Sequence, residues 1–211
     1  MLRHIIKDHT PYFVYYAAFL FVGLFYHKTT PEETAILFFS DHRSEYGNVF
    51  FTYCTHLGEF APYLITTLFF LWKRRKYAWT PIATAGLVML CSYYIKDYMG
   101  HPRPVMFFES HGLIKSIHFV PGVTILRGYN SFPSGHTMSA FAIYSLLCFT
   151  VGKNVLLQLL FFTLAVLVGV SRIYLVEHFP EDVLFGSLLG LSIAVFVYYI
   201  YSFFHVEQRV V

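Results

Sequence analysis

Six long apolar stretches constrain this chain more than any other feature of its sequence. They run over about Tyr12–Tyr26, Cys54–Trp72, Tyr77–Tyr98, His136–Val151, Asn154–Ile173 and Glu181–Phe204. A bilayer core of about 30 Å needs about 20 mostly apolar residues per helix, and these stretches approach that length. Only 13% of the 211 residues are charged, against about 25% in a typical soluble domain. We therefore expect an all-α integral membrane protein with six transmembrane helices, built as a single membrane-embedded domain over residues 1–211.

The segment between the first two stretches predicts a further, shorter helix. Thr30 precedes Pro31, and Glu33 follows three residues after Thr30, in the pattern of a capping box with proline at the first helical position. The apolar run after it is too short for a span and suits a helix that lies in the membrane interface. No small-residue cleavage pattern follows the first apolar stretch, so we expect that stretch to be a retained membrane helix.

The positions of the basic residues predict an orientation. Four of them fill the single turn Lys73–Lys76, between the second and third stretches. Basic residues concentrate on the cytoplasmic side of membrane proteins. We therefore expect both termini to be cytoplasmic, in a bacterial inner membrane. The long loop Gly100–Pro133 and the short loop Val176–Pro180 then share the periplasmic, outer face.

Composition also argues against several other classes of protein. The net charge of +3 is small and its basic residues form no single long run, so a nucleic-acid partner is not expected. Cys54, Cys91 and Cys148 lie within apolar segments, which indicates buried apolar side chains rather than disulfides or metal ligands. Although the chain has 11 histidines, none follows a helical zinc-binding pattern. We expect no metal site and no cofactor.

Polar residues gather at three places near the ends of the predicted helices. Lys96–Pro104 ends the third helix, Pro133–His136 opens the fourth, and Ser171–Asp182 covers the junction of the fifth and sixth. In an up-and-down bundle these three segments reach the same membrane face. Topology alone therefore predicts that three cations, two histidines and a carboxylate meet near one interface.

This group of side chains suits a phosphoryl dianion. Lys96, Arg103 and Arg172 would neutralise its oxygens, and the arginines can bind two oxygens at once. Ser134 and Gly135 begin a helix, where free backbone N–H groups and the positive end of the helix dipole favour anions. Gly135 also allows the backbone to approach closely, because it has no Cβ.

Two histidines in this group have the right neighbours for covalent phosphoryl transfer. A neutral imidazole attacks phosphorus when a carboxylate holds its other nitrogen, and Asp182 lies one helical turn after His178. We expect His178 to be the nucleophile and Asp182 its orienting partner. His136 would protonate the leaving alkoxide as general acid.

The three segments together resemble the signature of the type 2 phosphatidic acid phosphatase superfamily. Its order is Lys-x6-Arg-Pro, then Pro-Ser-Gly-His, then Ser-Arg-x5-His-x3-Asp. The matching positions are Lys96, Arg103, Pro104, Pro133, Ser134, Gly135, His136, Ser171, Arg172, His178 and Asp182. The resemblance implies a metal-independent phosphohydrolase that passes through a phosphohistidine. It implies the same roles for His178, Asp182 and His136, and phosphate binding by Lys96, Arg103, Ser134, Gly135 and Arg172.

Several alternatives stay open from the sequence. Lys96 and Arg103 taken singly fit interfacial anchors, and Asp182 fits a helix cap. Glu59 is a candidate to face the active site or contact a substrate headgroup, and Arg127 is a candidate to contact a headgroup or a second phosphate. The alternatives are a solvated interfacial carboxylate for Glu59 and a solvated loop charge for Arg127. The substrate would be a lipid phosphate: a polyprenyl diphosphate, lipid A, phosphatidylglycerophosphate or phosphatidic acid. A phosphotransferase with the same intermediate, and a non-catalytic lipid or anion transporter, are the competing functions.

Overall fold

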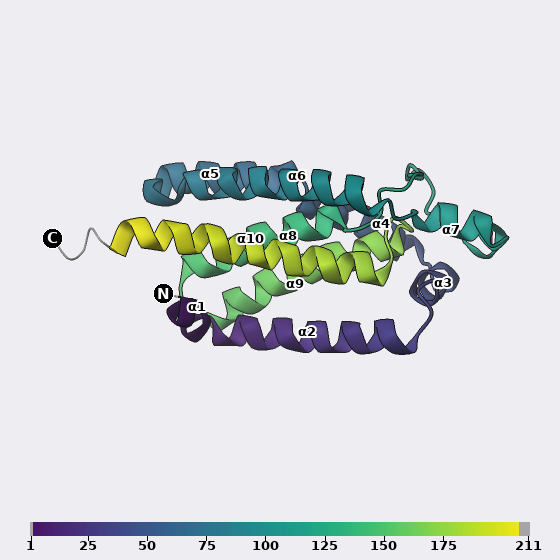
Figure 1. Ribbon diagram of the computed structural model, residues 1–211, viewed down its shortest axis with the longest axis horizontal. Coiled ribbons are helices and arrows are strands. Elements are labelled where there is room, and N and C mark those ends of the chain that lie inside the picture. The colour runs from purple at the N-terminus through teal and green to yellow at the C-terminus, as the bar shows by residue number, and fades with distance from the viewer. Residues whose placement is uncertain (1, 207–211) are drawn as a thin grey trace.

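The protein is a bundle of long helices, with the short helices α3, α4 and α7 at one end and the short helix α1 at the other (Figure 1). The computed structural model describes residues 2–206, and within this range it contains helices and no strand. The helices are α1 (Leu2–Asp8), α2 (Thr10–Thr29), α3 (Thr34–Asp41), α4 (Glu45–Cys54), α5 (Phe60–Lys73), α6 (Trp79–Met99), α7 (Pro104–Ser110), α8 (Gly135–Val151), α9 (Val155–Tyr174) and α10 (Pro180–Val206). Three 3₁₀ turns, η1 (Thr55–Gly58), η2 (Arg75–Tyr77) and η3 (Ile114–Ser116), connect some of them. The predicted all-α class is confirmed for the described residues.

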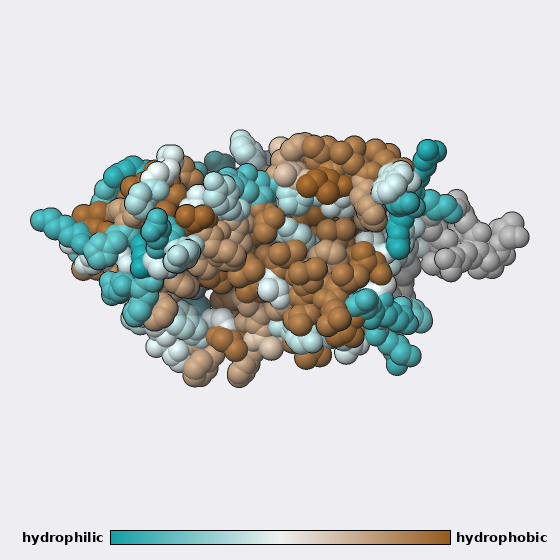
Figure 2. Space-filling model, turned by 180° about the vertical axis from the view of Figure 1, so that it is seen from behind, coloured by the Kyte–Doolittle hydropathy of each residue, from teal (hydrophilic) through white to brown (hydrophobic). Residues whose placement is uncertain are grey.

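Three segments of the described chain are long and apolar enough to cross a membrane: Arg75–Ser110, which includes α6, then Val155–Tyr174 and Pro180–Phe204. Two shorter helices, Phe60–Lys73 and Gly135–Val151, are also apolar. Figure 2 shows hydrophobic residues over the middle of one face, with hydrophilic residues towards both ends. This distribution matches the profile of a bilayer, in which an apolar core lies between two polar interfaces.

The predicted second span, Cys54–Trp72, is wrong as one continuous helix. α4 ends at Cys54, η1 follows, and α5 begins only at Phe60 after an extended Glu59. Gly58 explains the break, because it lies directly against the start of α8. A Cβ there would stand 2.7 Å from the carbonyl oxygen of His136 and 2.7 Å from Val168 Cγ1. Hydropathy alone does not register such a close backbone contact.

The predicted start of the short helix at Thr30 is also wrong. Thr30 ends α2, where its N–H donates to the Tyr26 carbonyl, and its backbone is extended. Extended backbone is the conformation that a following proline favours. α3 begins four residues later, at Thr34, and its N-cap residue Glu33 makes no side-chain cap. The first long helix, in turn, is longer than predicted, because α2 covers Thr10–Thr29 rather than Tyr12–Tyr26.

α8 is the central helix of the bundle, with 13 of its 17 residues buried. Two glycines of α10 bring the helices into close contact. A Cβ at Gly186 would stand 2.6 Å from the carbonyl oxygen of Ser134, and one at Gly190 would overlap the carbonyl oxygen of Met138. The small-residue pair of α10 therefore serves packing within the bundle. It fixes the start of α8 against the start of α10.

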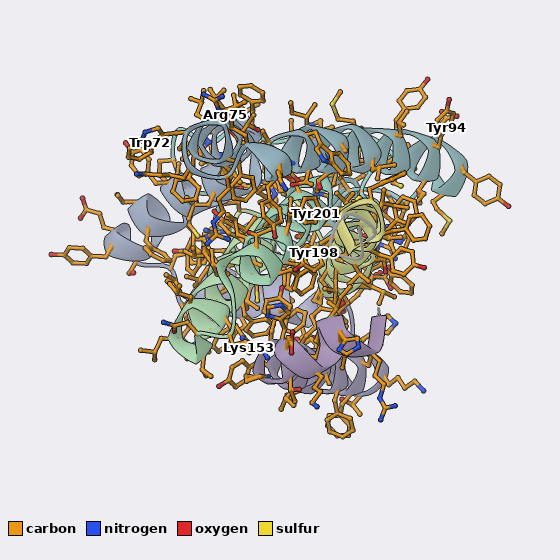
Figure 3. The ribbon with its side chains drawn as sticks, turned by 90° about the vertical axis from the view of Figure 1, so that its left-hand side faces the viewer. Trp72, Arg75, Tyr94, Lys153, Tyr198 and Tyr201 are labelled. Carbon is orange, nitrogen blue, oxygen red and sulfur yellow. The ribbon has the colours of Figure 1, made fainter. Side chains whose placement is uncertain are left out.

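The predicted cytoplasmic basic residues lie at the end of the bundle opposite α3 and α7. Figure 3 looks onto that end and shows Trp72, Arg75 and Lys153 around it. Lys153 forms an ion pair of 2.9 Å with Asp8 of α1, so α1 belongs to the same end. Arg209, which would add to this charge, lies outside the described residues. The three cysteines are free: Cys54 and Cys148 are buried, and Cys91 is half-buried.

Candidate active site

The three polar segments of the sequence meet at the end of the bundle that carries α3 and α7 (Figure 1). The N–H of Ser134, which precedes α8, donates to the carbonyl of Asp182 in α10 at 3.0 Å. Lys96 at the end of α6 donates through Nζ to the carbonyl of Asn130 at 2.9 Å. Arg103 bonds to Glu177, between α9 and α10, at 2.7 Å. The convergence predicted from topology is therefore present in the structure.

His178 and Asp182 form a buried pair one turn apart at the start of α10. His178 Nδ1 lies 3.2 Å from Asp182 Oδ2, and their side chains are 2% and 0% exposed. The same Oδ2 accepts from Ser131 Oγ at 2.6 Å and from the N–H of Phe179 at 2.9 Å. A carboxylate with these donors favours a proton on Nδ1, which leaves the lone pair on Nε2.

Burial decides the charge of His178. It lowers the pKa of this imidazole to about 3, although the Asp182 carboxylate acts in the opposite direction. Arg172 and Lys96 lower it further through their positive charge. The ring is consequently neutral near pH 7, which is the form that has a nucleophilic nitrogen.

A tight turn before His178 fixes where the ring lies. The N–H groups of Glu177 and His178 both donate to the carbonyl of Arg172, at 2.9 and 3.3 Å. Val176 has a φ of +61°, a left-handed conformation that is rare for a β-branched residue. Its side chain is nevertheless buried in an apolar cluster with Phe179 and Val183. Packing therefore holds a costly backbone geometry next to the candidate nucleophile.

Glu177 is a site residue that the sequence reasoning missed. Its Oε2 lies 2.7 Å from Arg103 Nη1 and 3.5 Å from Arg172 Nη2, and all three side chains are at most 7% exposed. Buried guanidinium groups need a counter-charge, and Glu177 supplies it for both. The sequence did offer a signal for Glu177. It is a carboxylate directly before His178, in the segment that also holds Arg172.

The remaining phosphate candidates surround the start of α8. Ser134 is the N-cap, buried, with Oγ accepting from Thr137 N. A Cβ on Gly135 would stand 3.2 Å from Ser92 Oγ, so glycine suits the close packing there. Asn130 joins two of the cations, because its carbonyl accepts from Lys96 and its Oδ1 accepts from Arg103 Nε at 2.7 Å. Asn130 and Ser131 were also missed by sequence reasoning, since both lie in a loop without a recognisable pattern.

His136 has a carboxylate partner of its own. Its Nε2 lies 3.3 Å from Glu59 Oε1, and the same oxygen lies 3.0 Å from His56 Nδ1. The His136 side chain is 32% exposed and that of Glu59 45%. Glu59, predicted as a headgroup contact, therefore faces the candidate acid from the break between η1 and α5.

Arg127 has a partner that is not among the predicted site residues. Its guanidinium forms two bonds with Glu109, of 2.6 and 2.7 Å, on an exposed surface. This paired arrangement matches the solvated loop charge that the sequence left open as an alternative.

The chain belongs to the PAP2 superfamily, whose family model matches residues 77–205. Lipid phosphate phosphatase 2 of Arabidopsis thaliana is 32% identical over 125 residues, covering 49% of this chain and 43% of that protein. Phosphatidylglycerophosphatase B of Bacillus subtilis (strain 168) is 41% identical over 69 residues, covering 29% of this chain and 34% of that protein. The chain thus spans less than half the length of these curated relatives.

Two solved structures have a similar fold. The crystal structure of Aquifex aeolicus LpxE matches with a TM-score of 0.65 and 26% identity, covering 77% of this chain and 91% of that one. A PAP2-type phosphatidylglycerolphosphate phosphatase from Bacillus subtilis, described as transmembrane, matches with a TM-score of 0.62 and 24% identity. It covers 92% of this chain and 95% of its own. Together with the apolar helices, these likenesses identify an integral membrane protein of the PAP2 type.

Proposed function

We propose that this protein hydrolyses a lipid phosphate through a phosphohistidine on His178. The observation that carries the proposal is the buried His178–Asp182 pair, neutral at the ring and placed among Lys96, Arg103 and Arg172. An anion-binding protein needs the cations, but it gains nothing from a histidine held in one tautomer by a buried carboxylate. The relatives named as phosphatases support the same class of reaction.

In the proposed reaction, His178 Nε2 attacks phosphorus while the ester or anhydride oxygen leaves. One N–P bond forms and one P–O bond breaks, and His136 gives its proton to the departing oxygen. Asp182 continues to accept the hydrogen bond from Nδ1–H of His178, and its negative charge stabilises the positively charged ring. A water molecule then attacks the phosphohistidine, gives its proton to His136, and inorganic phosphate leaves. The cations stabilise the negative charge on the phosphoryl oxygens. Such electrostatic stabilisation is usually the largest contribution to the rate of phosphoryl transfer.

The position of Glu59 supports a role other than the predicted headgroup contact. A carboxylate 3.3 Å from His136 Nε2 favours the protonated imidazole, because opposite charges stabilise each other. We assign Glu59 as a positioning residue that keeps His136 supplied with the proton it donates.

A lipid substrate fits the surroundings of this site. A cavity of about 190 Å³ lies beside Glu59 and Gly58 and is lined mainly by apolar residues of α5 and α6, including Phe60, Tyr63 and Met89, with Ser139 of α8. An apolar chain placed there would keep its phosphate near His136. The four predicted substrates, namely polyprenyl diphosphate, lipid A, phosphatidylglycerophosphate and phosphatidic acid, share the phosphoryl group that this site would bind.

The proposal extends to topology. We place α2, α5, α6, α8, α9 and α10 across the membrane as one domain, with α3 in the interface. The site then faces the periplasm, and the Lys73–Lys76 turn and both termini face the cytoplasm. The junction of α5 and α6, which holds the basic turn, lies at one end of the bundle, and α3 and α7 lie at the other end beside the site, which supports this arrangement (Figure 1). Labelling of an Arg75→Cys variant by an impermeant thiol reagent from outside intact cells would contradict it.

The deciding experiment is phosphate release by the purified protein from each of the four lipids. We expect stoichiometric inorganic phosphate from at least one, with no loss of activity in EDTA because side chains supply every step. Appearance of the phosphoryl group on an added alcohol instead would identify a phosphotransferase. EDTA inhibition reversed by a divalent metal would contradict the metal-independent mechanism. Lipid or anion transport that survives in His178→Ala would indicate the transporter.

A further inference from the structure

A cluster of one histidine and two glutamates lies beside the candidate active site and takes no part in the proposed reaction. Glu32 precedes α3, His101 follows α6, and Glu181 lies in the first turn of α10. One ligand atom from each lies within 4.8 Å of the other two, and all three residues are half-buried. Three segments far apart in the sequence thus direct a nitrogen and two carboxylate oxygens to one point.

The spacing of His101 and Glu181 suits a small, tetrahedral metal ion. His101 Nε2 lies 3.3 Å from Glu181 Oε1. Two ligand atoms that each bind Zn²⁺ at about 2.0–2.1 Å in tetrahedral geometry lie about 3.3 Å apart. One imidazole with two carboxylates is also a set of ligands that Zn²⁺ accepts, whereas Mg²⁺ prefers oxygen ligands alone. His27 lies close by, with Nδ1 3.6 Å from the other oxygen of Glu181.

The second nitrogen of His101 gives independent support. His101 Nδ1 lies 3.9 Å from Asp182 Oδ1. Both atoms are shielded from solvent and have no hydrogen-bond partner among residues 2–206, and the Asp182 side chain is 0% exposed. A metal-binding histidine almost always directs its other N–H to a carboxylate, which fixes the tautomer. At 3.9 Å the two atoms are too far apart for a hydrogen bond, so Asp182 Oδ1 becomes that carboxylate when the His101 ring moves towards it.

Electrostatics favour a cation at the same point. The acidic groups that face it are Glu32, Glu33, Glu181 and Asp182, and the basic groups are His27 and His101. Burial and the neighbouring carboxylates raise the pKa of Glu32, and His101 opposes them. A bound divalent cation would relieve the repulsion between these carboxylates.

We propose that Glu32, His101 and Glu181 bind a zinc-type divalent ion, and that this ion acts on the nucleophile through Asp182. With the metal on Nε2, His101 keeps its proton on Nδ1 and donates it to Asp182 Oδ1. Asp182 then serves two imidazoles, His101 through Oδ1 and His178 through Oδ2, so it stabilises a positive His178 ring less well. The bound ion therefore slows turnover. This last step rests on the proposed function, whereas metal binding does not.

The binding test uses purified full-length protein, freed of metal by a chelator and titrated with Zn²⁺ by calorimetry. We expect one Zn²⁺ per chain, with the affinity lowered at least about 10-fold in Glu32→Gln and in His101→Asn. Glu45→Gln is the control, because it removes the same charge from an exposed carboxylate outside the cluster, and its affinity should equal that of the wild type. Mg²⁺ should not compete. Equal affinity in the wild type and both ligand variants, or an equal loss in Glu45→Gln, would overturn the site.

The activity test compares phosphate release with and without saturating Zn²⁺ in the wild type and in Glu32→Gln. We expect turnover of the wild type to fall about 10-fold or more, and that of Glu32→Gln to change much less at the same concentration. Zinc that binds at one per chain without slowing the wild type would refute the link through Asp182. A chain that binds zinc but releases no phosphate in either state would contradict the proposed function while supporting the metal site. Circular dichroism melting of each variant confirms that it is folded.

Discussion

The two histidine–carboxylate pairs of the candidate site differ in almost everything except their spacing. His178 and Asp182 lie 3.2 Å apart with side chains that are nearly inaccessible, and Ser131 and a backbone N–H also bind the carboxylate. His136 and Glu59 lie 3.3 Å apart, but both are partly exposed and Glu59 also contacts His56. The His178–Asp182 pair is buried, whereas the His136–Glu59 pair is accessible to solvent.

The difference corresponds to two different tasks in the proposed reaction. A nucleophile needs a fixed lone pair and a neutral ring, and burial next to a carboxylate provides both. A general acid has to recover its proton in every cycle, so it needs exchange with solvent. Each prediction below tests whether burial assigns these tasks to His178 and His136 respectively.

Removing the buried histidine should have the largest effect. His178→Ala deletes the atom that forms the N–P bond, and we expect turnover to fall by about 10⁵-fold or more. Phosphate release measures it, and trapping of radiolabelled phosphoprotein in acid-free gels should fail in this variant. His118→Ala, at an exposed loop position, is the control and should keep full activity. If His178→Ala were as active as the wild type, the nucleophile would have to be another residue.

Neutralising the buried carboxylate of Asp182 should cause the second-largest loss of turnover. Asp182→Asn keeps the size of the side chain but removes the charge that selects the tautomer of His178, and a drop of about 10⁴-fold is expected for such a change. Single-turnover measurements should show that formation of the phosphoenzyme is the slowed step. A loss below about 10-fold would mean that the ring is oriented by its packing alone.

The exposed pair should be more tolerant. Glu59→Gln leaves His136 in place but removes its negative partner, and we expect a loss of about 10-fold, against about 10²–10³-fold for His136→Gln. The loss in Glu59→Gln should shrink with substrates whose leaving group is a phosphate, since such a group departs without a proton. Equal losses for all leaving groups would instead indicate a headgroup contact by Glu59.

The smallest expected effect is on stability as a function of pH. The folded-state pKa of His178 is lowered to about 3 by burial, whereas an unfolded histidine titrates near about 6.5. Between these values the unfolded chain binds the additional proton, so the stabilisation present above about pH 6.5 is lost as pH falls towards 3. The melting temperature in detergent should therefore fall between pH 7 and 4.5. His178→Asn should reduce that fall by at least about 2–4 °C, while His118→Asn should leave it unchanged.

Much of the site followed from the sequence because helix order fixes which helix ends share a face. Lys96, Ser134 and Asp182 belong to three segments, and alternating helix direction brings them together whatever the details of packing. The counter-charge did not follow in the same way. Glu177 became visible only when the structure placed it between Arg103 and Arg172, because the need for it arises from burial.

The fold was predicted least well where backbone packing overrides hydropathy. The stretch Cys54–Trp72 is apolar enough for one helix, yet contact of Gly58 with the start of α8 interrupts it. That interruption is what directs Glu59 at His136. A window that averages hydropathy over about 20 residues cannot detect a contact with a helix 80 residues away. The prediction of spans from hydropathy thus gave the right elements for α6, α9 and α10. It missed the break before α5, which places Glu59 beside His136.

Glu177 has a consequence for how the enzyme would handle its substrate and its product. Because one carboxylate already occupies both arginines, an incoming phosphate in the proposed site binds by ion exchange rather than by filling a vacant positive hole. Its affinity is then the difference between two strong interactions, which keeps a highly charged pocket from retaining inorganic phosphate. In the proposed reaction, Glu177 would compete for the same guanidinium groups when inorganic phosphate forms, and so favour its release. The carboxylate would thereby raise the rate of product release, although it makes no contact with the bond that breaks.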